Sequence, residues 1–112
     1  MKKPDVLRKQ EDFTKLYKKG KSAGSRHLVL LYRENGLSYN RKAFLASKKV
    51  GNSVCRNRAR RLMREAFRKT ETELPTGYDF LLIARHSILE CKCDQVERSL
   101  KSCLQRAGLI KR

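Results

Sequence analysis

The side chains best suited to chemistry in this sequence are basic ones that cluster in its middle. Residues 41–69 contain eleven lysines and arginines against one acid, Glu65: Arg41, Lys42, Lys48, Lys49, Arg56, Arg58, Arg60, Arg61, Arg64, Arg68 and Lys69. A guanidinium group can bind two phosphate oxygens at once and can also stack on a base. At helical spacing one face would carry Asn57, Arg60, Arg61, Arg64 and Arg68. Such a face favours binding to a folded RNA, whose phosphates approach from several directions.

A charged helix face that is merely solvated usually mixes acids with bases, because such pairs stabilise the helix. Here Arg60 and Arg64 repel one another at i, i+4 spacing, which costs the helix about 0.2–0.5 kcal/mol. We therefore interpret the face as a binding surface. The opposite side of the same helix is apolar and is expected to face the core through Cys55, Ala59, Leu62, Met63, Ala66 and Phe67.

Groups that would support catalysis by the protein itself are scattered. The two histidines, His27 and His86, have no partner at ligand spacing, and Cys91 and Cys93 form a C-x-C pair rather than a zinc knuckle. The acids form no paired-carboxylate motif, and there is no glycine-rich phosphate loop. We expect no catalytic residue, no metal site and no tightly bound cofactor in the protein. Cys55 and Cys103 are interpreted as small core residues.

Length and composition set further limits. The 112 residues carry 28 bases and 11 acids, so the net charge is 28 − 11 = +17, and 39% of residues are hydrophobic. One domain over 1–112 is expected, and its self-repulsion calls for an anionic partner. Nucleic acid is the leading candidate and an anionic membrane surface the runner-up. No apolar run is long enough to span a membrane, and none follows the charged residues 1–5. A cytoplasmic location with unpaired cysteines is therefore expected.

Several elements must position these side chains. Periodicity and turn signals predict a helix over 10–19, strands over 27–33 and 42–49, a helix from 52 or 53 to about 70, a strand over 78–84, and a helix that starts at a D-x-x-E capping box at Asp94 and ends at Gly108. The first two strands are expected to be joined antiparallel by a polar loop. The fold class is α+β, with helices packed on a small mixed sheet.

The basic segment also follows an ordered motif. It runs S-K-K-x-G-N from Ser47, R-N-R-x-[KR]-R from Arg56 and R-E-x-F-R from Arg64. This pattern closely resembles the signature of the bacterial ribonuclease P protein subunit. The resemblance extends to 11–21, 78–85 and 100–108, so it covers nearly the whole chain.

The resemblance implies a small α/β sandwich of about four strands and three helices with a left-handed βαβ crossover. It also implies the protein part of a ribonucleoprotein endonuclease, whose RNA subunit removes the 5′ leader of precursor tRNA. Mg²⁺ would be held mainly by that RNA. The partners would be the catalytic RNA and precursor tRNA, with no membrane and no obligate protein partner.

Residue roles follow from the same resemblance. RNA binding is implied for the arginine-rich signature, which consists of Arg56, Asn57, Arg58, Arg60, Arg61, Arg64 and Arg68. A cleft for the single-stranded leader is implied for Phe13, Tyr17, Ser47 and Lys48, where aromatic rings would stack on bases. The family often has tyrosine at the position of Leu31. Tyr32 is one step further along, which reverses its face in a strand, so the choice between the two stays open.

Other classes of protein fit less well. A basic ribosomal-type RNA-binding protein without a role in cleavage would explain the charge but not the ordered motif. A protein-only nuclease would need clustered acids or histidines. A membrane-surface module would need exposed apolar residues, whereas the apolar helix stripe is needed for the core.

Overall fold

The computed structural model describes residues 5–111. The expectation about a secretion signal depends mostly on residues 1–4, which lie outside the described residues. In chain order the elements are α1 (Gln10–Lys19), β1 (Lys21–Gly24), β2 (Leu28–Glu34), β3 (Arg41–Leu45), α2 (Ser53–Thr70), β4 (Tyr78–Ala84) and α3 (Cys93–Arg106), with short 3-10 helices at Glu71–Glu73 and His86–Glu90. The predicted bounds of α1, α2 and β4 are confirmed, whereas β3 is four residues shorter than predicted at its end.

The sheet has the strand order β1-β2-β4-β3. β1 pairs antiparallel with β2, β2 pairs antiparallel with β4, and β3 pairs parallel with β4. The strands over 27–33 and 42–49 run in opposite directions, as expected for strands joined antiparallel by a loop, but they do not pair with each other because β4 lies between them. β1 was not predicted, since its sequence, Lys-Ser-Ala-Gly, lacks the apolar alternation of a half-buried strand.

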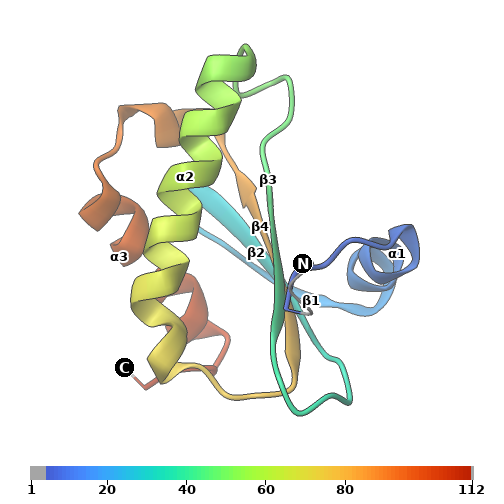
Figure 1. The fold of residues 1–112 in the computed structure, drawn as a ribbon. Helices are drawn as coiled ribbons and strands as arrows, with labels where there is room; N and C mark the ends of the chain where they lie inside the picture. Colours follow the sequence, from blue (N-terminus) through green and yellow to red (C-terminus); the bar gives the residue numbers. More distant parts are fainter. Residues whose placement is uncertain (1–4, 112) are drawn as a thin grey trace.

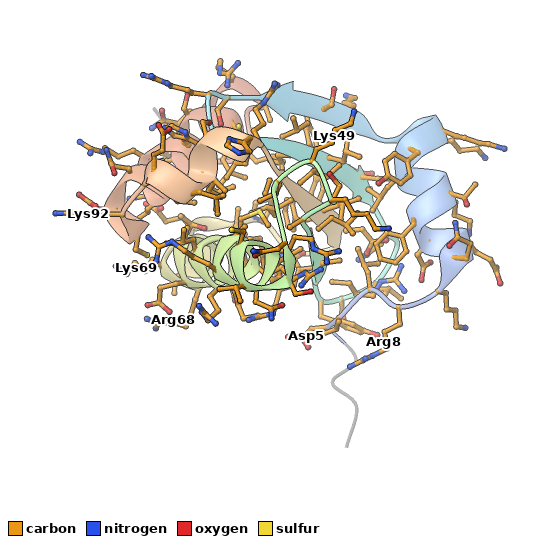
Figure 2. All side chains as sticks on the ribbon, turned by 90° about the horizontal axis from the view of Figure 1, so that it is seen from above. Asp5, Arg8, Lys49, Arg68, Lys69 and Lys92 are labelled. Atoms are coloured by element: carbon orange, nitrogen blue, oxygen red, sulfur yellow. The ribbon has the colours of Figure 1, made fainter. Side chains whose placement is uncertain are left out.

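The molecule has three layers (Figure 1). α2 and α3 cover one face of the sheet, and α1 lies against the other face. α2 connects the parallel strands β3 and β4. With α2 in front of the sheet and β3 pointing up, the chain moves to the left to reach β4, so the crossover is left-handed, as the resemblance implies (Figures 1 and 2).

Alternation along the strands divides the apolar side chains between two clusters. The main cluster lies between the sheet and helices α2 and α3, and its largest buried side chains include Phe67, Phe80 and Leu82. The smaller cluster lies under α1 and consists of Leu7, Leu16 and Leu81, with Phe13, Leu31, Ala43 and Ile83 packed against it. The predicted apolar stripe of α2 is confirmed: Ala59, Met63, Ala66 and Phe67 are buried, and Cys55 and Leu62 are half-buried.

The two long helices begin in different ways. The side chain of Asn52 accepts a hydrogen bond from the backbone N–H of Cys55 at 3.0 Å, which caps α2 as predicted. The predicted capping box at Asp94 is wrong. The N-cap of α3 is Lys92, two residues before Asp94, and the Gln95 side chain accepts a hydrogen bond from the Lys92 backbone N–H at 2.7 Å. Asp94 is left on the surface, where it pairs with Arg98.

Candidate nucleic-acid interface

The seven signature residues all lie on α2 and form what we call the arginine surface: Arg56, Asn57, Arg58, Arg60, Arg61, Arg64 and Arg68. Arg56 and Arg60 are half-buried, and the other five are exposed. Viewed from above, Arg68 and Lys69 lie on the side of α2 that faces away from the sheet (Figure 2). The apolar stripe holds the helix in one rotational setting, so these side chains are presented to solvent together.

Contacts within the arginine surface leave most of its charge available. Arg60 donates a hydrogen bond to the Asn57 side chain at 2.9 Å. Among residues 5–111, the ion pairs of this surface are limited to Arg68 with Glu65. The hydrogen bonds from Arg68 lower the pKa of the Glu65 carboxyl, which therefore stays ionised. A single compensated arginine leaves a strongly positive helix face that suits phosphate.

Arg64 links the arginine surface to the other side of the molecule. Its guanidinium lies over the Phe44 ring, 5.7 Å from the ring centroid. Arg64 and Phe44 line a cavity of about 380 Å³ beside β3, together with Phe13 of α1 and Lys42. We call this the β3 cavity. The arginine surface of α2 and an aromatic side chain of α1 therefore meet at one place.

The four residues expected in a leader cleft are brought together only in part. Phe13 is half-buried, packs on the cluster under α1 and lines the β3 cavity. Tyr17 is 57% exposed, so its ring is available to a ligand. Ser47 and Lys48 are exposed in the turn that follows β3, where the Val50 N–H donates to the Ser47 carbonyl at 3.0 Å. They flank the sheet but do not line the β3 cavity.

The position of Leu31 and Tyr32 is settled by strand alternation. Leu31 packs with the cluster under α1, on the same face of the sheet as Phe13. Tyr32 packs against the main cluster on the opposite face. Leu31 therefore lies on the sheet face that α1 covers, and Tyr32 lies on the face that α2 and α3 cover.

A partly buried ionic network, which sequence reasoning missed, holds α1 against the sheet. Asp79 of β4 is 2% exposed and accepts two hydrogen bonds from the Arg41 guanidinium, at 2.8 and 2.7 Å. The same guanidinium reaches the Asp12 carboxylate of α1 at 3.3 Å. The hydrogen bond to Asp79 is the main cause of a raised pKa for Arg41. The signal in the sequence was Asp79 itself, an acid inside an otherwise apolar strand.

Metal-ligating and nucleophilic groups are dispersed over the part of the chain that the structure describes. Between residues 5 and 111, no three histidine, cysteine or acidic side chains are grouped so that they could hold a metal ion. The four cysteines are unpaired; Cys91 and Cys103 are buried, and Cys55 and Cys93 are half-buried. His27 shares a hydrogen bond of 2.9 Å with Ser87. Within the same residues, no helix has the length and apolarity to cross a membrane.

The fold and the surface define a class: a small α+β nucleic-acid-binding protein whose arginine surface is carried on one helix beside an aromatic-lined cavity. Comparison with known proteins narrows this class. The family model for ribonuclease P matches residues 1–108. The chain belongs to the bacterial ribonuclease P protein family.

Relatives of similar length support this assignment. The chain is 44% identical over 109 residues to the ribonuclease P protein component of Pelotomaculum thermopropionicum, covering 97% of each chain. It is 39% identical to that of Alkaliphilus oremlandii, covering 98% of this chain and 96% of the relative.

Solved structures agree on the fold. The RNase P protein of Staphylococcus aureus has a TM-score of 0.85 at 31% identity, covering 97% of this chain and 100% of that one. The RNase P protein of Thermotoga maritima has a TM-score of 0.80 at 32% identity, covering 90% and 96%. The protein is thus a subunit of a ribonucleoprotein endoribonuclease in tRNA 5′ processing, and it associates with ribonuclease P RNA. The ribosomal-type alternative is not supported.

Proposed function

We propose that the arginine surface of α2 binds phosphates of the catalytic RNA, and that the sheet face beside α1 receives the single-stranded 5′ leader of precursor tRNA. Phe13, Tyr17, Ser47 and Lys48 would line the path of the leader. The observation that carries the proposal is the position of Arg64, which belongs to the arginine surface and also lines the β3 cavity with Phe13. Catalytic RNA and leader would therefore lie next to each other on the protein.

The chemistry of the two surfaces suits these two roles. Guanidinium groups on a rigid helix bind phosphates of a folded RNA whatever its sequence. An exposed tyrosine offers a stacking platform to an unpaired base, which is also independent of sequence. This division of labour would let one protein serve many precursor tRNAs with different leaders.

The protein's part in cleavage would be electrostatic and positional. In this proposal the catalytic Mg²⁺ ions are held mainly by the RNA, and the positive charge of the protein reduces phosphate repulsion between RNA and substrate. Less Mg²⁺ would then be needed to assemble the active complex. The four unpaired cysteines suit a reducing compartment, so we propose that the complex works in the cytoplasm.

A three-part cleavage assay tests the proposal. Precursor tRNA is incubated at low Mg²⁺ concentration with the RNA subunit alone, with the rigorously purified protein alone, or with both. Only the mixture is expected to release the leader at an appreciable rate, and raising Mg²⁺ should restore cleavage by the RNA alone. Cleavage by the protein alone would overturn the proposal. Equal rates with and without protein at low Mg²⁺ would also contradict it.

A further inference from the structure

A second cavity, of about 480 Å³, lies where β2 ends, where β4 begins and beside the turn after α3. Its two tyrosines pack on the sheet face that α2 and α3 cover. Its lining includes Tyr32, Tyr78, Lys19, Lys21, Glu34 and Gly108. We call it the tyrosine cavity. It shares no residue with the arginine surface, with the β3 cavity or with the four residues proposed for the leader.

The two tyrosines of this cavity are held in place by the core but are not enclosed by it. Tyr78 is stacked on Phe80, with ring centroids 5.8 Å apart and ring planes at 21°. Tyr32 lies opposite Phe80 in the register of β2 and β4. Both tyrosines are half-buried, so part of each ring is open to the cavity. Rigid aromatic rings with open area are a platform on which a base can stack.

Charged and polar groups at the rim match the remaining parts of a nucleotide. Lys19 and Lys21 are exposed and can bind a phosphate from the ends of α1 and β1. Glu34 accepts a hydrogen bond from the Tyr78 hydroxyl at 3.4 Å and has a carboxylate able to accept from a base amine. The volume falls in the ordinary range for small-ligand sites, about 300–1,000 Å³.

We propose that the tyrosine cavity binds one unpaired nucleotide of an RNA partner, with its base against Tyr78 and Tyr32 and its phosphate at Lys19 and Lys21. This contact would lie on the opposite side of the sheet from the proposed path of the leader. The protein would then bind RNA on both faces of its sheet. Binding of a nucleotide in the tyrosine cavity does not depend on whether the leader binds beside α1.

Titration of the full ¹⁵N-labelled chain with single nucleotides tests the proposal. AMP, CMP, GMP and UMP are added separately, with inorganic phosphate and adenosine as the two partial ligands, and amide resonances are followed by NMR. The amides of Tyr32, Tyr78 and Gly108 are expected to shift, with the amine-bearing bases binding more tightly than uracil. Each nucleotide should bind at least fivefold more tightly than phosphate. The proposal would be overturned if phosphate bound as tightly as the nucleotides, or if only amide resonances of α2 shifted.

Matched variants separate this site from its surroundings. The double variant Lys19→Glu and Lys21→Glu leaves the core intact and should weaken AMP binding at least fivefold. Lys15→Glu with Lys18→Glu makes the same charge change on exposed positions that do not line the cavity, and should weaken it less than twofold. Tyr39→Ala should have no effect, since Tyr39 is an exposed tyrosine that does not line the tyrosine cavity. A loss with Tyr39→Ala, or equal losses in both lysine pairs, would contradict the proposal.

The source of the nucleotide is found by crosslinking in the assembled complex. Glu34 is exposed and is replaced by the photoreactive residue benzoylphenylalanine. A crosslink formed without precursor tRNA assigns the nucleotide to the catalytic RNA, and one that requires precursor tRNA assigns it to the substrate. Either result supports the proposal. Active complex that gives no crosslink to RNA from this position would count against it, whatever the outcome of the leader experiments.

Discussion

Arg41 and Asp79 form a two-pronged ion pair between the neighbouring parallel strands β3 and β4, with Nε to Oδ1 at 2.8 Å and Nη2 to Oδ2 at 2.7 Å. Asn35 donates a further hydrogen bond to the same carboxylate at 3.0 Å. Because Arg41 also reaches Asp12, this pair holds together the sheet and the helix that carries Phe13 and Tyr17. The pair therefore positions the proposed leader path although it does not belong to it.

Removing one partner of this pair should destabilise the protein strongly. Arg41→Ala would leave the Asp79 carboxylate buried without its cation, and loss of about 3–5 kcal/mol in the free energy of unfolding is expected. The free energy of unfolding is measured by urea denaturation, with circular dichroism as the signal. Arg68→Ala is the control, because its pair with Glu65 is exposed and screened by solvent, so the loss of stability should be much smaller. Similar losses in the two variants would show that Arg41 has no special structural role.

Arginines of α2 should set the salt dependence of RNA association. Arg60→Ala and Arg64→Ala should each weaken binding to the catalytic RNA and reduce the slope of log K against log salt by roughly 0.7–0.9, one phosphate contact each. The measurement is binding of labelled RNA at several salt concentrations. Arg98→Ala, on α3 and paired with Asp94, should leave the slope unchanged. An unchanged slope for both α2 variants would place those arginines away from RNA.

Replacing Tyr17 should weaken the binding of precursor tRNA but not the binding of mature tRNA. Tyr17→Ala is expected to weaken binding of precursor tRNA to the assembled complex by about 1–3 kcal/mol, since one stacking platform is lost. Tyr17→Phe keeps the ring and should bind nearly normally. Tyr39→Ala removes another exposed aromatic, 40% exposed between β2 and β3, and serves as the control. Equal losses with mature tRNA would refute a role in leader binding.

Gly51 of the S-K-K-x-G-N motif should resist substitution for a conformational reason. Its φ of +146° is disfavoured for other residues, and a Cβ atom there would lie 2.9 Å from Cβ of Cys55. Gly51→Ala is expected to destabilise the protein by about 1–3 kcal/mol, as measured by thermal unfolding. Gly36→Ala is the comparison: its φ is also positive but the space around it is open, so the loss should be smaller. The reverse ranking would contradict this account.

Cys91 should be the slower of two neighbouring thiols to react. Burial, followed by the nearby Glu90 carboxylate, raises the pKa of Cys91 above its ordinary value of 9.0. The folded protein therefore holds this proton more tightly than the unfolded chain, and stability should fall as pH rises above about 9. At pH 8, iodoacetamide should modify the half-buried Cys93 before Cys91, as read by mass spectrometry. Faster modification of Cys91 would disprove the assigned burial.

Local patterns in the sequence determined where the main helices of this protein lie and which of their sides face the core. The spacing of Phe13 and Leu16 predicted α1, and the spacing of Ala59 and Met63 predicted which side of α2 faces the core. The arginine surface follows from the second of these, because residues on the opposite side of a helix must face solvent. Helix periodicity involves neighbours three or four residues apart, so it can be read directly from the chain.

Only the tertiary structure decided which strands are neighbours and which side chains meet across them. β4 lies between β2 and β3 although it is the last of the four strands in the chain. The ion pair of Arg41 with Asp79 joins residues 38 positions apart. Arg64 and Phe13 line one cavity, and Tyr78 and Lys21 line another, only because segments far apart in the chain are packed together. Such contacts leave no periodic trace in the sequence. Both cavities are products of the order of the strands, which is set by packing over the whole domain.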